Sequence, residues 1–381
     1  MHAIAVVPGT KGTQLIERPD PSITADDDVK LHVIRVGICG TDREEAAGGR
    51  SKPPAGKNGL VIGHEMLGQV TEVGTSVKEV KPGDLALFIV RRGCGHCPAC
   101  IIDRADMCES GDYLERGIWG MDGYEAEFVV DKERYVVHLP RELEPIGVLT
   151  EPTSVVEKAI DEAVRVQSSR LPDAGSVPDW LYGRRCLIAG LGPIGLLGAM
   201  ILQLRGADVY GLDIVAEDSP RPQWLKTIGG KYINAKTIPA DKVDDIIGPM
   251  DLVLEAAGIT SLDFELLDAL ATNGILVLTG IPGEDRPMQM PGAELIRRLV
   301  LKNQAMIGSV NASRGHFRMA VDDLRSANLR WPGQIVKLIT HRHQASDAAD
   351  AFATHPPDEI KAVIEWSRIS NPSTPNLKFE I

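Results

Sequence analysis

Four cysteines lie close together in the segment GCGHCPACIIDRADMC, which spans residues 93–108. They are Cys94, Cys97, Cys100 and Cys108, in the spacing C-x2-C-x2-C-x7-C. Four thiolates from one short loop give the closed tetrahedral coordination that suits a structural zinc ion. An iron–sulfur cluster is the alternative, but bacterial ferredoxin sequences close with a shorter gap and a proline after the last cysteine. Here Glu109 takes that position, so zinc is the favoured metal.

A second group of possible metal ligands lies upstream. Cys39 follows an apolar run in GICGTD, and His64 and Glu65 are adjacent in GHEMLG. A closed thiolate site has no open position for a substrate, whereas a thiolate, an imidazole and a carboxylate can bind zinc and leave one. Each of these residues alone is a weak signal, because a lone buried cysteine is usually a small hydrophobe. Together they predict a catalytic zinc site.

A glycine-rich turn, GLGPIG, has the spacing G-x-G-x-x-G. It consists of Gly190, Leu191, Gly192, Pro193, Ile194 and Gly195. The turn follows one predicted strand, opens a predicted helix, and precedes a second strand that ends at Asp213. This context is typical of dinucleotide binding, in which the glycines let the pyrophosphate approach and the acid accepts hydrogen bonds from ribose hydroxyls. A plain glycine turn in a doubly wound sheet is the alternative. Ile214 and Val215 stand where a 2′-phosphate would need a cation, so NAD is expected over NADP.

The elements around these motifs change character along the chain. Residues 1–150 contain short apolar or alternating runs stopped by glycine and proline, which predicts a mostly β region. Apolar positions at helical spacing predict a helix over 151–167, and the polar, proline-containing segment 168–180 predicts a linker. From Arg185 onward strands and helices alternate, and continuous apolar strands predict a parallel sheet. Two short strands within residues 316–381 are expected to pair back with the first half.

Composition excludes several classes of function. The 381 residues are enough for two domains, and the formal net charge of −12 argues against nucleic-acid binding, including a zinc finger. The start, MHAIAVVPGTKG, has an apolar run too short for a secretory signal, and no stretch reaches the length of a membrane span. A cytoplasmic protein with reduced thiols and a small-molecule substrate is therefore expected, with neither nucleic acid nor membrane as a partner.

These motifs resemble those of the zinc-dependent medium-chain alcohol dehydrogenase superfamily over essentially the whole chain. GICGTD is similar to its catalytic-cysteine motif, GHE to its His–Glu motif, CGHCPAC to its structural-zinc lobe and GLGPIG to its nucleotide turn. ERGIWGMDGY, EPTSVVEKAIDEA and IGSVNASRGHF resemble the microbial, archaeal-type glucose dehydrogenases, which oxidise aldoses at C1. The resemblance implies a GroES-like catalytic domain at residues 1–160 and 312–381, with a structural-zinc lobe at about 91–110. It implies a Rossmann nucleotide-binding domain at residues 161–311.

The resemblance also implies roles for residues near the metal. Cys39, His64 and Glu65 would bind the catalytic zinc, and Glu151 would approach it directly or through water. Thr41 would contact the reacting oxygen. The ordinary alternatives are a helix N-cap for Thr41 and a favourable interaction with the helix dipole for Glu151.

For the sugar, the resemblance implies contacts from Glu115 and Asn311, in addition to Thr41 and Glu151. A surface ion pair is the alternative for Glu115. The remaining implied cofactor contacts are Thr279, Gly280, Ile281, Ser309, Val310 and Asn311. This chain departs from some family members at Val90 and Val155, where they have polar residues that bind sugar hydroxyls, which puts the preferred aldose in question.

The implied activity is zinc-dependent oxidation of an aldose, with D-glucose expected, at C1 to the aldonolactone with hydride transfer to NAD(P). Two zinc ions per chain and a homodimer or homotetramer are also implied. A polyol or secondary-alcohol dehydrogenase on the same fold is one alternative. A non-catalytic nucleotide-binding relative is another, against which the intact Cys39, His64 and Glu65 argue.

The cysteine cluster generates the first prediction. Replacing Cys100 by serine should lower the melting temperature or disrupt assembly, while the folded fraction keeps its turnover per active site, because the four thiolates leave no open position on the metal. Thermal melting, zinc content and active-site titration measure these effects. An inert folded fraction that retains its other zinc would contradict the structural role.

Overall fold

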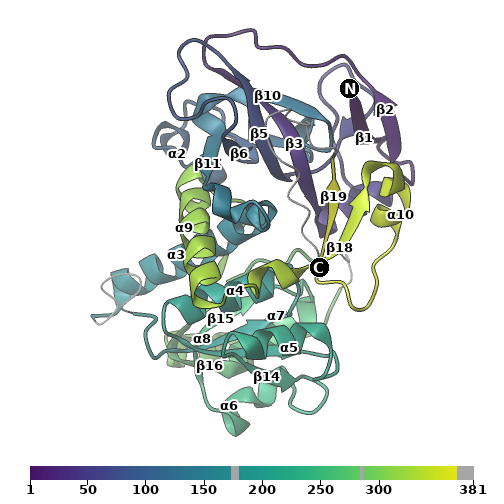
Figure 1. Ribbon diagram of the computed structural model, residues 1–381. Helices are drawn as coiled ribbons and strands as arrows, with labels where there is room; N and C mark the ends of the chain where they lie inside the picture. Colours follow the sequence, from purple (N-terminus) through teal and green to yellow (C-terminus); the bar gives the residue numbers. More distant parts are fainter. Residues whose placement is uncertain (173–179, 284–286, 367–381) are drawn as a thin grey trace.

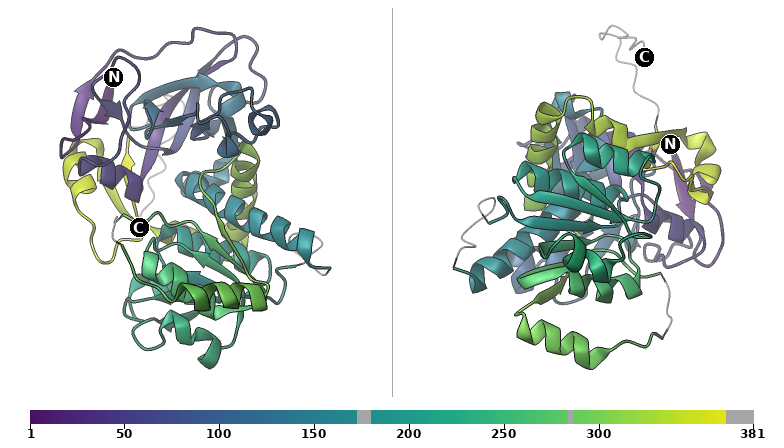
Figure 2. Two further views of the ribbon diagram at one scale, coloured as in Figure 1. Left: turned by 180° about the vertical axis from the view of Figure 1, so that it is seen from behind. Right: turned by 90° about the horizontal axis from the view of Figure 1, so that it is seen from below.

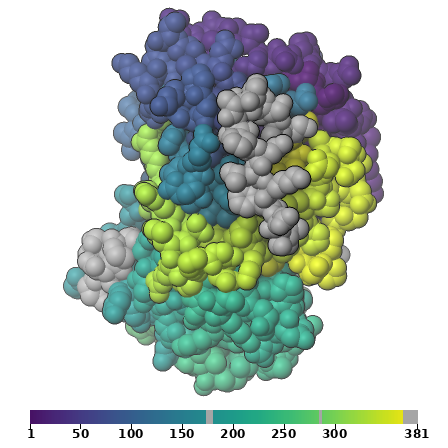
Figure 3. All heavy atoms as spheres, in the orientation of Figure 1, coloured from purple at the N-terminus to yellow at the C-terminus, as the bar shows by residue number. Residues whose placement is uncertain are grey.

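The computed structural model describes residues 1–172, 180–283 and 287–366 of the chain. Figure 1 shows a mainly β part above a layered α/β part, with the long helices α3 and α9 beside the junction. In the space-filling view of Figure 3, the yellow C-terminal residues lie beside the purple N-terminal half rather than with the green residues below. No helix among the described residues combines the length and the apolar character that a membrane span requires.

A seven-stranded sheet forms the centre of the β part, in the order β11-β6-β5-β3-β19-β18 with β10 paired to β3. Its middle strand β3 (Asp28–Ile38) is buried along almost its whole length. It pairs antiparallel with β5 (Glu65–Val73) and with β19 (Lys361–Glu365), which comes from the far end of the described chain. The other strands are β6 (Leu85–Phe88), β10 (Phe128–Lys132), β11 (Val136–Leu139) and β18 (Ile339–Gln344).

The two C-terminal strands differ in how they return to the first half. The predicted pairing is confirmed for β19, which is hydrogen-bonded to β3. It is wrong for β18, which pairs in parallel with β19 because β19 already occupies that edge of β3.

Smaller elements complete the β part. The short strands are β1 (His2–Val6), β2 (Gln14–Glu17), β4 (Leu60–Val61), β7 (Arg91–Arg92), β8 (Leu114–Arg116) and β9 (Gly120–Met121). The short helices are α1 (Gly40–Ala46), α2 (Pro98–Ile101) and α10 (Ala348–Ala353). These short elements connect the longer strands, and most of the polar motifs lie in or next to them.

The lower part is a six-stranded parallel sheet in the order β14-β13-β12-β15-β16-β17. Its strands are β12 (Arg185–Ala189), β13 (Asp208–Asp213), β14 (Lys231–Asn234), β15 (Met250–Glu255), β16 (Leu270–Leu278) and β17 (Ala305–Gly308). The connecting helices are α4 (Pro193–Leu204), α5 (Pro220–Thr227), α6 (Val243–Ile246), α7 (Thr260–Ala269) and α8 (Gly292–Leu301). This strand order is that of a doubly wound dinucleotide-binding sheet. The predicted α/β fold class, a mostly β part plus a Rossmann-type parallel sheet, is confirmed.

Both faces of the parallel sheet are covered, as Figure 2 shows from two further directions. Along β12, Cys186 and Ile188 pack into one apolar core, whereas Leu187 and Ala189 pack into the other. Alternating side chains of a strand point to opposite faces, so a strand buried on both sides must be apolar throughout. Cys186 accordingly has a structural place in the core.

Helix α3 (Thr150–Arg170) joins the two parts and packs against α9 (Arg314–Arg330) and α4. It continues three residues beyond the predicted helix, so the linker prediction is wrong for residues 168–170. The helix stops at Leu171, which is extended, because a residue before a proline is disfavoured in the helical conformation. The predicted linker residues 173–179 lie outside the described part of the chain.

Candidate active site and metal centres

The three predicted catalytic ligands converge at the ends of two paired strands. Cys39 follows β3 and caps α1, whereas His64 precedes β5 and Glu65 begins it. Their ligand atoms all lie within 4.8 Å of one another. The strand register brings Gly37 opposite Glu65, where a Cβ would overlap the carboxylate. A glycine at residue 37 therefore leaves the space that the Glu65 side chain needs.

The donor set of this cluster fits a cation. Glu65 is buried, and its Oε2 has no hydrogen-bond partner among the described residues. A buried carboxylate oxygen without a partner is costly, and a metal ion removes that cost. One thiolate, one imidazole and one carboxylate are ligands that zinc prefers. The residues Cys39, His64 and Glu65 thus fit the zinc site that the sequence predicts.

Asp42 orients this site and was not singled out in the sequence. Its Oδ1 lies 3.3 Å from Nδ1 of His64, and its Oδ2 accepts a hydrogen bond from the backbone N–H of Cys39 at 2.7 Å. Burial alone would raise the pKa of Asp42, but the neighbouring His64 lowers it below its usual value. The Asp42 carboxylate faces Nδ1 as an ion-pair partner, which leaves Nε2 for a metal. The three-residue spacing from Cys39, typical of a capping box, was the available sequence signal.

Lys361 is the second partner that the sequence did not reveal. Its Nζ lies 2.5 Å from Oε1 of Glu65 and donates to the carbonyl of Ile38 at 2.9 Å. Burial would lower the pKa of Lys361, but the charge of Glu65 raises it overall, so the ammonium stays charged. The two partners are 296 residues apart, which puts the pair beyond any local sequence pattern.

Glu151 and Thr41 lie at helix starts beside the ligands. Glu151 is in the first turn of α3, and burial raises its pKa to about 7, with His64 acting in the opposite direction and Glu65 in the same direction. Its carboxyl therefore lies within electrostatic reach of both neighbouring ligands. Thr41 follows the first residue of α1, whose N-cap is Cys39, so the N-cap alternative for Thr41 is wrong.

The four clustered cysteines also converge. Their sulfur atoms lie within 4.8 Å of one another. Backbone N–H groups of Cys97 and Cys100 point at the sulfurs of Cys94 and Cys97, at 3.3 and 3.5 Å. Such donors favour thiolate over thiol, which suits a zinc ion with four sulfur ligands.

One cavity of about 770 Å³ joins the catalytic ligands to the glycine turn. Cys39 and Glu65 line it together with the turn at Gly190–Ile194 and with Asp213, and none of the four clustered cysteines does. Gly190 has a φ of +91°, which a side chain would disfavour. The cavity therefore brings the predicted catalytic metal and the predicted nucleotide site to one space.

The end of the cavity beside β13 carries both an acid and a cation. The Asp213 carboxylate accepts the backbone N–H of Leu191 at 2.8 Å and that of Ile214 at 2.6 Å. Arg221 also lines the cavity, and its Nη2 donates to the carbonyl of Glu359 at 2.9 Å. Arg221, in the first turn of α5, thus brings an arginine to the site, although Ile214 and Val215 do not supply one.

Glu255 was not singled out in the sequence, and it directly precedes Ala256 and Ala257, which line the cavity. It ends β15 and is buried, and its carboxylate accepts the backbone N–H groups of Ala257 and Gly258 at 2.6 Å each. It also accepts the N–H of Gly280 at 3.1 Å, and the Thr279 hydroxyl donates to its carbonyl at 2.6 Å. Glu255 therefore fixes the segment that the family resemblance assigns to the nicotinamide.

The two predicted sugar-binding residues meet directly. Asn311 Nδ2 donates to Oε1 of Glu115 at 2.7 Å, and the Arg91 guanidinium donates to the same oxygen at 3.0 and 2.9 Å. Glu115 thus forms an ion pair with Arg91, as the alternative interpretation expects. The side chains of Arg91 and Glu115 are, however, only 9% and 13% exposed. This pair is not an ordinary surface salt bridge.

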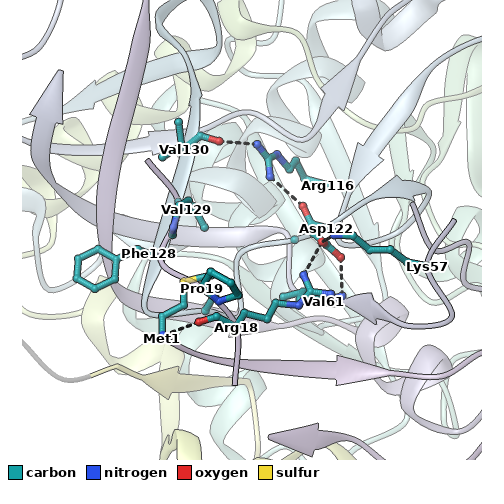
Figure 4. Close-up of a pocket in the computed structure, with 13 residues that line it drawn as sticks. Met1, Arg18, Pro19, Lys57, Val61, Arg116, Asp122, Phe128, Val129 and Val130 are labelled. Atoms are coloured by element: carbon teal, nitrogen blue, oxygen red, sulfur yellow. Dashed lines mark hydrogen bonds and ion pairs between the residues drawn. The ribbon is translucent and has the colours of Figure 1, made fainter. Parts of the chain in front are cut away.

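A second hollow, of about 460 Å³, lies beside the N-terminus (Figure 4). None of the residues predicted from the sequence lines it. Asp122 Oδ2 accepts from Arg18 at 2.5 Å and from Lys57 at 2.7 Å, while Arg116 donates to the Asp122 carbonyl at 3.0 Å. These charged groups already bind one another, so the hollow is a weaker candidate for a ligand site.

Two known families match adjoining parts of the chain. Residues 25–141 match the alcohol dehydrogenase GroES-like domain, and residues 144–366 match the glucose dehydrogenase C-terminus. The glucose 1-dehydrogenase of Methanocella arvoryzae is 35% identical over 369 residues, which cover 96% of this chain and 99% of that protein. The glucose 1-dehydrogenase of Thermoproteus tenax is 37% identical over 367 residues, with the same two shares.

Solved structures agree with these matches. The glucose dehydrogenase of Haloferax mediterranei, in complex with NADP, zinc and gluconolactone, has a TM-score of 0.86 at 31% identity, and the match covers 97% of this chain and all of that one. Galactitol-1-phosphate dehydrogenase from Escherichia coli, at 23% identity and a TM-score of 0.77, shares the fold. The resemblance read from the sequence motifs is confirmed: this chain belongs to the glucose dehydrogenase family of the zinc-dependent medium-chain alcohol dehydrogenases.

Proposed function

We propose that this protein oxidises an aldose, with D-glucose as the expected substrate, at C1 to the aldonolactone and transfers the hydride to a nicotinamide cofactor. The observation that carries the proposal is that Cys39, Glu65 and residues 190–194 of the glycine turn line one cavity together. Relatives named glucose 1-dehydrogenases, and a similar structure that contains NADP, zinc and gluconolactone, support it. Initial rates over a panel of aldoses and polyols with each cofactor test it. Faster oxidation of polyols or secondary alcohols would replace the aldose by that substrate class.

In the proposed reaction, Cys39, His64 and Glu65 hold the catalytic zinc, with Glu151 at its side. The bound ion supplies a Lewis acid that makes the C1 hydroxyl more acidic. Thr41 Oγ1 accepts the proton of that hydroxyl and passes it towards solvent. A nicotinamide cofactor held at the glycine turn would supply the acceptor for the C1 hydride, so that the aldose would be oxidised to the lactone.

Sugar and nicotinamide contacts complete the proposal. Glu115 and Asn311 bind sugar hydroxyls, and their mutual hydrogen bond aligns them before the substrate arrives. The nicotinamide contacts are Thr279, Gly280, Ile281, Ser309, Val310 and Asn311. The cysteine cluster at 94–108 holds a second, structural zinc ion.

We also propose that the functional divisions follow the pairing of the strands. The catalytic domain comprises residues 1–160 and 312–381, with the zinc lobe at 91–110, and the nucleotide-binding domain comprises 161–311. The return of β19 to β3 supports the first assignment, and the closed set of parallel strands supports the second.

We propose further that the protein forms a homodimer or a homotetramer in the cytoplasm. Strand β17 is the edge of the parallel sheet, and Met306 on it is exposed. Helix α8, which precedes it in the chain, exposes Ile296, Val300 and Leu301. Apolar groups on an open sheet edge favour association. Light scattering of the purified enzyme should give two or four chains, and a monomer would contradict this.

The catalytic ligands generate the next prediction. His64→Ala should reduce turnover by at least about a hundredfold and lower the zinc content from two ions to one per chain, because one metal ligand is lost. The cofactor should still bind, as measured by nucleotide titration, because the glycine turn is untouched. The exposed His138 provides the control, and His138→Ala should keep both zinc ions and full turnover. A near-normal rate in His64→Ala would refute the assignment.

Cofactor choice generates another prediction. The kcat/KM ratio at saturating sugar should favour NAD over NADP by at least about tenfold, because a 2′-phosphate would meet the Asp213 carboxylate. Asp213→Asn should narrow this ratio by weakening NAD binding and relieving the repulsion, whereas Asp218→Asn, at an exposed neighbouring acid, should not. A ratio that favours NADP would overturn the prediction and point to Arg221 as the phosphate ligand.

A further inference from the structure

The lobe that holds the clustered cysteines, residues 91–110, contains a buried acid that reaches outside it. Asp106 lies between Cys100 and Cys108, and its side chain is fully buried. Its Oδ2 lies 2.8 Å from Arg104 Nη2 and 3.0 Å from Lys158 Nζ. The first cation belongs to the lobe, whereas the second belongs to α3.

Lys158 connects this acid to the segment that carries a proposed sugar ligand. Its Nζ also donates to the carbonyl of Val310 at 2.8 Å, and its side chain is only 3% exposed. Val310 directly precedes Asn311, whose φ of +64° is in the left-handed region. A hydrogen bond to the carbonyl of residue 310 fixes the peptide plane before Asn311 and so its direction into the site.

A second connection from the same acid reaches the other sugar ligand. The backbone carbonyl of Asp106 accepts from Arg91 Nη1 at 2.8 Å. The remaining nitrogens of that guanidinium hold Glu115 Oε1, which also accepts from Asn311. The cross-strand pairing of Arg91 with Glu115 in β7 and β8 places them side by side. Glu115 and Asn311, the two proposed sugar-binding residues, are thereby both connected to the lobe.

Helix α3 carries both ends of this arrangement. Lys158 follows Glu151 by seven residues, which is close to two helical turns and places both on one face. The helix therefore presents an acid to the catalytic ligands and, two turns later, an ammonium to the zinc lobe. A rigid element between the two metal centres sets their separation.

We infer that Lys158 is a positioning residue for sugar binding: it ties the cysteine lobe, through Asp106, to Val310 and so holds Asn311 in register with Glu115. The inference rests on the proposed function. It gives the structural zinc a role in substrate affinity beyond the folding of its own loop. None of the hydrogen bonds and ion pairs of Lys158 with described residues reaches the catalytic ligands or the glycine turn.

The test compares Lys158→Met with Arg104→Met in the zinc-loaded enzyme. Lys158→Met removes the donor to Val310 and leaves Asp106 paired with Arg104, so no buried acid is orphaned. Arg104→Met removes the other cation from the same acid without any contact to Val310. The expected result is an increase in the KM for glucose of about tenfold in Lys158→Met, corresponding to one lost charge-assisted hydrogen bond, and no change in Arg104→Met. Two zinc ions per chain should be retained in both variants, and the KM for the cofactor should be unchanged in Arg104→Met.

A binding measurement separates positioning from chemistry. Titration of the enzyme–NADH complex with freshly dissolved D-gluconolactone should show weaker binding for Lys158→Met and unchanged binding for Arg104→Met. Equal shifts in both variants, or none in Lys158→Met, would overturn the inference. If Lys158→Met does not fold, Lys158→Arg serves, since it keeps the charge beside Asp106 but presents a fork in place of a single ammonium. An increased KM at unchanged melting temperature supports the inference there, and an unchanged KM overturns it.

The same data distinguish this failure from failure of the proposed function. A wild-type enzyme that oxidises no aldose refutes the proposed function, and the inference with it. A wild-type enzyme that oxidises glucose with the KM unaffected by Lys158→Met refutes the inference alone.

Discussion

The Glu65 carboxylate is buried with one oxygen against the Lys361 ammonium and the other without a hydrogen-bond partner among the described residues. Removing a carboxylate from water costs free energy unless opposite charges lie next to it. Here each of the two oxygens of Glu65 needs a positive charge beside it. The ammonium arrives on β19, which closes the sheet at β3. A metal held with Cys39 and His64 would supply the other side. The environment of Glu65 is therefore complete only when β19 pairs with β3. In the sequence, β19 comes after all the strands of the parallel sheet.

This requirement explains the arrangement of the chain around the cavity. The glycine turn and the catalytic ligands are contributed by different sheets, and both open into one space. Helix α3 lies at the junction of the two sheets and packs against α9 and α4. A hydride transfer needs two bound reactants at a fixed separation, and rigid elements on both sides of a shared cavity provide it.

The two cysteine-containing centres differ in what surrounds them. Cys39 shares its cluster with His64 and Glu65, and it lines the cavity. The four clustered cysteines bring their sulfur atoms close to one another, and none of these cysteines lines that cavity. Yet their lobe is not isolated, because Asp106 binds Lys158 and Arg91 through buried contacts. A structural metal can thus stabilise a binding site that it does not touch.

Local patterns in the sequence were sufficient for the motifs, the alternating β and α/β regions and the family. Cysteine spacing, the glycine turn and the apolar period each depend on neighbours within a few residues, and the backbone geometry of such short segments follows from residue type. The pairing of β18, the end of α3 and the partners Asp42, Lys361, Glu255 and Lys158 were not predicted. Most of these depend on contacts between distant segments: Lys361 meets Glu65 across 296 residues, and Asn311 meets Glu115 across 196. The sequence by itself determined which side chains could bind zinc, nucleotide and sugar. Only the tertiary structure decided which buried charges face them, because strand order and register bring those charges together.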